Sequence, residues 1–185
     1  MNLIRSVGND IDFILNDFIF FIKKKLFIGN YRNSIIFTLI SILNISMFLS
    51  LKTNVNRLVF FIVFSLFLIN IYCMFLYICL PFFENLAFKL FKNVTKREFS
   101  KLFPYTLTPF MFLFPISFIF MGSFLENIYF GIICVLSFVL IVKLMMVLYK
   151  KNFTEIILLL ITSFAFIFIT CFLVFYFSII LFSFL

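Results

Sequence analysis

Long charge-free apolar runs alternate along this chain with short stretches that carry nearly all of its charge. A helix that crosses a bilayer needs about 20 mostly apolar residues, and several runs approach or exceed that length. The runs are continuously apolar instead of alternating with polar residues, which favours helices over the strands of a membrane barrel. The pattern therefore predicts an all-α, polytopic transmembrane helical bundle of about five spans. The predicted spans are residues 34–51, 58–80, 105–125, 128–149 and 156–178.

Composition supports this interpretation. Hydrophobic residues make up 65% of the 185 residues, and Phe alone contributes 35 of them. Soluble domains are about 45–50% apolar, and a soluble chain of this length buries only about 70% of its surface on folding. We therefore expect an integral membrane protein whose first partner is the lipid bilayer.

Positive charges gather in every second segment between the predicted spans, and these segments all lie on one side of the membrane. Among the 15 lysines and arginines, only Lys52 and Arg57 fall on the side opposite the rest. The positive-inside rule assigns the richer side to the cytoplasm, which predicts an N-terminus inside and a C-terminus outside. Topology and attraction to anionic headgroups account for the net charge of +8, so we expect no nucleic-acid partner.

Residues 1–33 form a cytoplasmic segment with an imperfect amphipathic pattern, ahead of a membrane domain at residues 34–185. Two interpretations stay open for it: a helix that docks a partner, or an interfacial lead-in to the first span. The apolar positions that recur at helical spacing are Ile11, Ile14, Leu15, Phe18 and Ile22.

A second interfacial helix is predicted at residues 95–103, on the cytoplasmic side. Thr95 and Glu98 have the spacing of a capping box. The helix is expected to end at Phe103, because a following proline disfavours the helical region for the residue before it.

The third predicted span contains Pro109 and Pro115. Each proline removes a backbone hydrogen bond, and in lipid the freed carbonyl needs another partner. Thr106 and Thr108 are candidate partners. The two prolines indicate either a plain structural bend or a broken helix that lines a transport site.

Lys143 is the one charge inside the predicted spans. It lies six residues before Tyr149, about 9 Å from the cytoplasmic end of its helix. Its side chain is expected either to snorkel to that end or to form a functional site.

Residue types needed for common catalysis are missing. The chain has no His, which excludes a Ser-His-Asp triad and an imidazole proton relay. It has no phosphate-binding glycine loop, and its four cysteines all fall within predicted spans without a CxxC pair. We therefore expect no enzyme activity, no cofactor and no metal.

Residues 98–115, EFSKLFPYTLTPFMFLFP, resemble a characteristic region of the Yip-type membrane domain, the family of Ypt/Rab-interacting proteins and their bacterial relatives. Tyr105 and Pro109 stand where that family has an aromatic residue and an early proline. Residues 148–166, LYKKNFTEIILLLITSFAF, are similar to the family's turn into its last span. The longer acidic motifs of eukaryotic members are missing, so the chain looks like the bacterial branch.

The resemblance implies a non-enzymatic membrane protein that organises protein or lipid partners, in the plasma (inner) membrane if the chain is bacterial. Other membrane proteins or a second copy are its expected protein partners. The main alternative is a small transporter or a membrane subunit of a transport complex. A polar cavity around Pro109, Pro115, Lys143 and Asn70 favours that alternative, and a tightly filled bundle opposes it. A membrane enzyme of lipid metabolism is a third hypothesis; it needs carboxylates or hydroxyls clustered around a cleft on the cytoplasmic side, and the sequence supplies only scattered ones.

Overall fold

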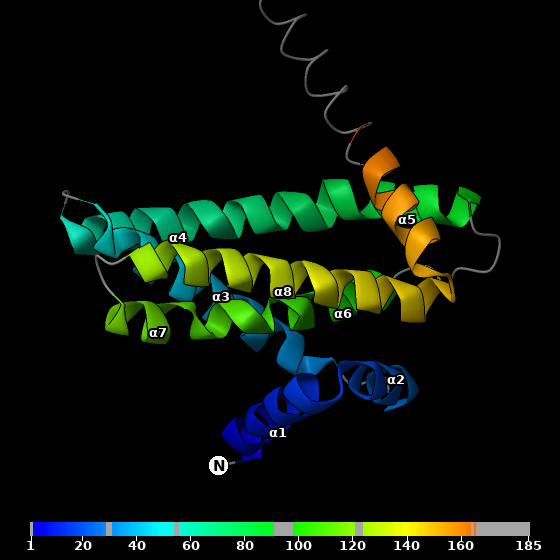
Figure 1. Ribbon diagram of the computed structural model, residues 1–185, viewed down its shortest axis with the longest axis horizontal. Helices are drawn as coiled ribbons and strands as arrows, with labels where there is room; N and C mark the ends of the chain where they lie inside the picture. The colour runs from blue at the N-terminus through cyan, green and yellow to red at the C-terminus, as the bar shows by residue number, and fades with distance from the viewer. Residues whose placement is uncertain are drawn as a thin grey trace, which may run out of the picture.

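Every regular element in the described part of this computed structural model is a helix, and the long helices lie side by side (Figure 1). The described residues are 2–28, 31–53, 56–90, 98–120, 124–163 and 165. The elements are α1 (Asn2–Asn16), α2 (Phe18–Ile28), α3 (Arg32–Leu51), α4 (Arg57–Met74), η1 (Phe75–Cys79), α5 (Leu80–Leu90), α6 (Glu98–Leu102), η2 (Phe103–Phe112), α7 (Leu113–Ile119) and α8 (Phe124–Tyr149).

Four of the described helices are long and apolar enough to cross a membrane. The first and fourth predicted spans match Asn33–Leu51 and Phe124–Tyr149, with starts shifted by one and four residues. For the fifth predicted span the structure describes only the start, in the shorter apolar helix Phe153–Ser163, together with residue 165. The rest of that span lies outside the described residues.

The second predicted span ends at residue 80, just before Pro81, but the helix does not end there. Helix continues through Pro81 as α5, because the turn before it is a π-helix in which the Leu80 amide donates to the Phe75 carbonyl. A π turn is wider than an α turn, which leaves room for the proline ring beside the preceding turn. The helix Arg57–Ala87 is about 46 Å long at 1.5 Å per residue, longer than a hydrocarbon core of about 30 Å.

The third candidate span runs over Phe99–Ile119, so it begins and ends earlier than predicted. The α-helix ends at Leu102, close to the expected stop before Pro104, but the chain continues as the 3-10 helix η2 instead of breaking. The expected interfacial helix is therefore continuous with the span over its described part. Thr95, one half of the expected capping box, lies outside the described residues.

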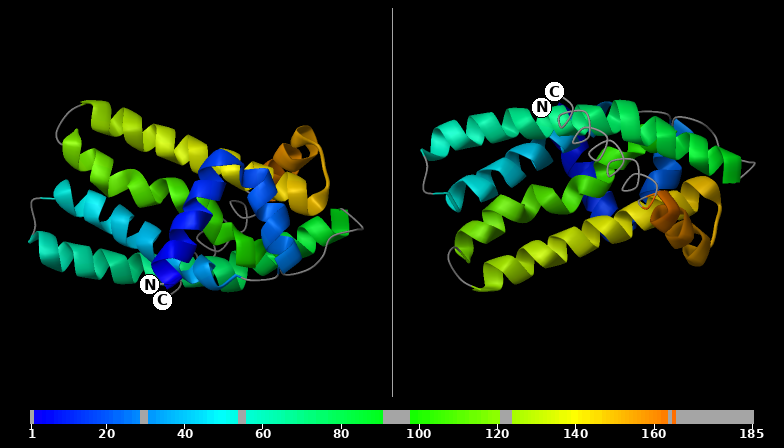
Figure 2. Two further views of the ribbon diagram at one scale, coloured as in Figure 1. Left: turned by 90° about the horizontal axis from the view of Figure 1, so that it is seen from below. Right: turned by 90° about the horizontal axis from the view of Figure 1, so that it is seen from above.

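Helix η2 is central, with α3 on one side and α8 on the other, as Figure 2 shows from two directions. Helix α4 packs mainly against α3, and most of its large apolar side chains are exposed. Its outer surface is therefore available to lipid.

Apolar packing is uneven along the bundle. The larger buried cluster joins α1 and α2 to α3, η2, α8 and the start of the helix Phe153–Ser163. The smaller one consists of Phe48, Leu113 and Ile133. Helices α1 and α2 cover one part of the bundle, which we call the docked half. The opposite part, where α3 ends and α8 begins, is called the far end.

Candidate functional site beneath the N-terminal helices

Helices α1 and α2 fold against each other and lie across the bundle, on the side opposite α4 (Figures 1 and 2). Asp17 starts α2, where its Oδ1 accepts a hydrogen bond from the Phe20 amide at 3.0 Å. A carboxylate at this position satisfies a free backbone N–H of the first helical turn. From the predicted apolar stripe, Ile14, Phe18 and Ile22 are buried, whereas Leu15 is exposed.

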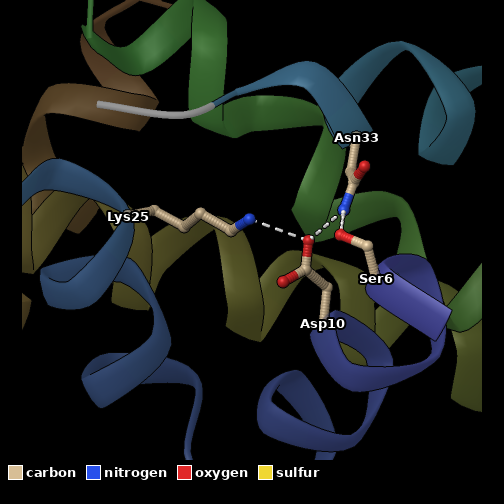
Figure 3. Close-up of polar contacts among 4 residues, drawn as sticks. All are labelled: Ser6, Asp10, Lys25 and Asn33. Atoms are coloured by element: carbon tan, nitrogen blue, oxygen red, sulfur yellow. Dashed lines mark hydrogen bonds and ion pairs between the residues drawn. The ribbon is translucent and has the colours of Figure 1, made fainter. Parts of the chain in front are cut away.

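A buried carboxylate connects these helices to the first span (Figure 3). Asp10 Oδ2 accepts hydrogen bonds from Lys25 Nζ at 2.8 Å and from Asn33 Nδ2 at 2.7 Å. Asn33 Nδ2 also lies 2.9 Å from Ser6 Oγ. Since Ser6 and Asp10 belong to α1, Lys25 to α2 and Asn33 to α3, the cluster joins three helices at one oxygen.

Tyr105 of η2 lies beside this polar cluster. Its ring is fully buried and meets the rings of Phe21 and Phe37 edge-on, each with a centroid separation of 5.0 Å. Lys25 Nζ lies 5.5 Å from the Tyr105 ring centre and 5.4 Å from that of Phe21, within cation–π range. Lys25 is therefore held by one carboxylate and two aromatic faces.

The two prolines of the third span lie away from this cluster. Pro109 is half-buried in η2 and Pro115 is exposed in α7. The expected threonine partners both donate one turn back, Thr108 Oγ1 to the Tyr105 carbonyl at 2.6 Å and Thr106 Oγ1 to the Phe103 carbonyl at 2.7 Å. In an α-helix Pro109 would free the Tyr105 carbonyl, but in the 3-10 helix η2 it frees that of Thr106, so neither hydrogen bond replaces the one that Pro109 removes.

Neighbouring helices bind further carbonyls of this irregular segment. Ser41 of α3 donates to the Leu107 carbonyl at 3.0 Å, and Tyr129 of α8 donates to the Phe112 carbonyl at 3.1 Å. Side chains of adjacent helices are a usual way to satisfy backbone groups that a break in a membrane helix releases.

Lys143 lies elsewhere, on an exposed part of α8. It lines a hollow of about 860 Å³ between α2, the second half of α8 and the chain up to Phe153, which we call the lysine groove. Neither proline nor Asn70 lines this groove, and Asn70 instead donates to the Leu66 carbonyl of its own helix. Apolar side chains of the groove include Ile19, Leu26, Val139, Val142, Met146 and Phe153, and its lysines are Lys23, Lys143, Lys150 and Lys151.

The three consecutive lysines at residues 23–25 thus have three different environments. Lys25 turns inward to Asp10, Lys24 Nζ lies 4.2 Å from the Phe13 ring centre, and Lys23 lines the groove. Helical spacing gives a signal for the groove, because Ile19, Lys23 and Leu26 recur at i, i+4 and i+7 and so share one face of α2.

Comparisons of the chain with protein-family models, with curated proteins and with solved structures find no match. Among the described residues, no group of three or more His, Cys, Asp and Glu side chains could hold a metal ion. The cluster around Asp10 and the lysine groove are the two arrangements of charged side chains described above that bear on function.

Proposed function

We propose that the chain is a non-enzymatic, Yip-like integral membrane protein that organises protein or lipid partners at the cytoplasmic face of a membrane. The observation that carries the proposal is the attachment of α1 and α2 to the bundle through buried Asp10. Surface helices held in one position give a partner a preformed binding surface, so little ordering entropy is lost on binding.

Exposed aromatic side chains on the N-terminal helices support this proposal. Phe20 and Phe27 of α2 are both exposed, Phe27 almost completely, although the same helix buries Phe21 and Ile22. Aromatic side chains are enriched at protein interfaces and in the headgroup region of membranes. These two residues are therefore the positions at which a partner is most directly expected.

The distribution of charge supports an N-in, C-out arrangement with the fifth span at residues 156–178. Lys23, Lys25, Lys143 and Lys150 belong to α2 or to the last turns and end of α8, and α2 packs against α8. Positive charge is retained on the cytoplasmic side of membranes. In a bacterium this arrangement fits the plasma (inner) membrane.

The main alternative is a small transporter or a membrane subunit of a transport complex. It is favoured by the ten-residue 3-10 helix with an internal proline, since broken helices line many transport sites. Against it, Pro115, Asn70 and Lys143 are all exposed, and side chains bind several carbonyls of the irregular segment. The organising role therefore has the stronger support.

Site-specific photo-crosslinking of the full-length chain in cell membranes tests the proposal. A photoreactive residue at Phe20 is expected to form discrete adducts that the same probe at lipid-facing Leu58 does not form. Asp10→Ala should abolish these adducts, whereas Asp12→Ala, which removes an exposed carboxylate of the same helix, should preserve them. Identical adducts at Phe20 and Leu58 would contradict the proposal.

A solute-flux assay and a topology assay test the proposal further. Flux through vesicles containing the purified chain that is lost in Lys143→Leu would favour the transporter. In a cysteine-free background, an impermeant thiol reagent added to intact cells should label Phe124→Cys and spare Asn16→Cys. Labelling of both positions, or of Asn16→Cys alone, would overturn the N-in arrangement.

A further inference from the structure

The lysine groove combines an apolar wall with a basic rim. Its volume of about 860 Å³ lies within the range of about 300–1,000 Å³ that is usual for ligand sites. Val139, Val142 and Met146 of α8 face Ile19 and Leu26 of α2 across it. Such a wall suits a hydrocarbon chain better than a polar metabolite.

The rim of the groove carries one sign of charge. Four lysines line it, and none of its described lining residues is an aspartate or glutamate. Lys151 is paired with Glu155 at 3.0 Å, whereas the ion pairs of the described residues do not include Lys23, Lys143 or Lys150. The groove therefore has an excess of positive charge without a matching carboxylate.

One of the groove lysines has a backbone conformation that is unfavourable for lysine. Lys150 follows the last residue of α8 with a φ of 51°, in the left-handed region where glycine is the favoured residue at a helix C-terminus. Lys143 lies seven residues earlier on α8, two turns deeper along the same face. Two lysines beside one apolar wall suit a phospholipid, because the lysines can bind the headgroup phosphate and the wall can contact an acyl chain.

We propose that the lysine groove binds an anionic phospholipid of the cytoplasmic leaflet, with its phosphate between Lys143, Lys150 and Lys23 and one acyl chain along α8. Basic pockets between membrane helices on the cytoplasmic side bind anionic headgroups in this way. A zwitterionic lipid fits less well, because its ammonium group meets lysines and no carboxylate. The inference rests on the proposed function in taking α8 as membrane-embedded, and it names the lipid class that the protein would hold.

Tryptophan quenching in vesicles tests this inference, because the chain has no Trp of its own. Val139→Trp places a reporter inside the groove, and Val135→Trp places one on the same helix outside it, where the side chain is exposed. The full-length variants are reconstituted into phosphatidylcholine vesicles that contain equal amounts of brominated phosphatidylglycerol or brominated phosphatidylcholine. Brominated phosphatidylglycerol should quench the groove reporter several-fold more than brominated phosphatidylcholine, and the two lipids should quench the outside reporter equally.

Matched charge variants locate the effect. Lys143→Gln with Lys150→Gln should abolish the preference, because each lysine strengthens binding of an anionic headgroup by roughly fivefold. Lys24→Gln with Lys89→Gln removes the same charge outside the groove and should preserve the preference. Equal quenching of the groove reporter by both lipids, or equal loss in the two double variants, would overturn the inference.

Two further outcomes are distinguishable. Inorganic phosphate in excess should leave the preference for phosphatidylglycerol unchanged. If added phosphate abolishes that preference, the ligand is a free anion and the inference of a bound lipid is overturned. If neither lipid quenches the outside reporter of Val135→Trp, α8 is not in the bilayer, which overturns the proposed function together with the inference. Normal quenching of that reporter, without a lipid preference in Val139→Trp, overturns the inference alone.

Discussion

Two ion pairs, one in each part of the bundle, differ in length and in the exposure of their lysine, although the carboxylate is buried in both. In the docked half, Lys25 and Asp10 are 2.8 Å apart, with side chains only 13% and 12% exposed. At the far end, Lys52 and Glu126 are 3.7 Å apart, with the Lys52 side chain 37% exposed and the Glu126 side chain 8% exposed. Lys52 also donates to the Asn127 side chain and lies over the Phe48 ring.

The difference indicates where the fold depends on charge. A buried ion pair adds little net stability compared with an apolar pair, but removing one partner leaves a buried charge that has no counter-ion. A longer pair whose lysine reaches solvent is partly screened, so neutralising its carboxylate costs less. The attachment of α1 and α2 should therefore be far more sensitive to single substitutions than the far end.

Asp10→Ala is expected to have the largest effect. It leaves Lys25 buried without its carboxylate and removes an acceptor of Asn33, so the free energy of opening α1 and α2 should fall by about 3–5 kcal/mol. Hydrogen exchange of the α1 and α2 amides in detergent measures this quantity. Asp12→Ala, at an exposed carboxylate, is the control, and a loss in Asp10→Ala no larger than in the control would remove the contrast.

The sequence predicts the long helices well because their signal is local. An apolar run of sufficient length defines a span whatever surrounds it, and the segments at residues 34–51 and 128–149 needed no knowledge of the fold. The hydrogen bond from Thr108 to the Tyr105 carbonyl was also predictable, because donor and acceptor lie three residues apart on one helix, but the 3-10 geometry that moves the carbonyl freed by Pro109 to Thr106 was not. The continuation of helix beyond residue 80 was not predictable either, since the apolar pattern does not mark the π turn before Pro81.

The polar cluster has no such local signal. Lys25 and Asn33 lie 15 and 23 residues from Asp10, and all three look like ordinary surface residues in the sequence. Tyr105 was singled out through a resemblance, yet its contact with Lys25 depends on how α2 lies across η2. For Lys143 the snorkelling and functional interpretations were both open in the sequence, and its position in the lysine groove beside Lys23 and Lys150 could not be read from the pattern.

Replacing both members of the buried pair should cost less than replacing one. In Asp10→Leu with Lys25→Met no buried charge remains, but Asn33 loses an acceptor, which costs about 1–3 kcal/mol for a buried polar group. The double variant should therefore be more stable than Asp10→Ala in the same exchange measurement. A double variant that is equally or more destabilised would show that the pair itself contributes the stability.

Glu126→Gln tests the far end and should have a smaller effect. The Lys52 side chain is partly exposed and keeps its contacts with Asn127 and Phe48, so the free energy of unfolding should fall by about 1 kcal/mol or less. Thermal unfolding in neutral detergent measures the change, and Lys52→Gln, which removes this counter-ion from the buried Glu126 carboxylate, should cost more. A loss as large as that of Asp10→Ala would mean that both parts of the bundle depend equally on charge.

The smallest effect is expected at the third ion pair, Lys151 with Glu155, which follows α8. A hydrogen bond from Lys151, and after it one from the Asn152 amide, lowers the pKa of the Glu155 carboxyl from its usual 4.5. A carboxyl with a lowered folded pKa contributes stability above its unfolded pKa and loses it as the pH falls through the folded value. The unfolding temperature in detergent should therefore contain a small decrease below about pH 4.5 that Glu155→Gln removes. Since both side chains are substantially exposed, this decrease should be near the limit of measurement at high salt. A large decrease that depends on Glu155 would mean that this exposed pair contributes as much stability as the pair of Asp10 and Lys25.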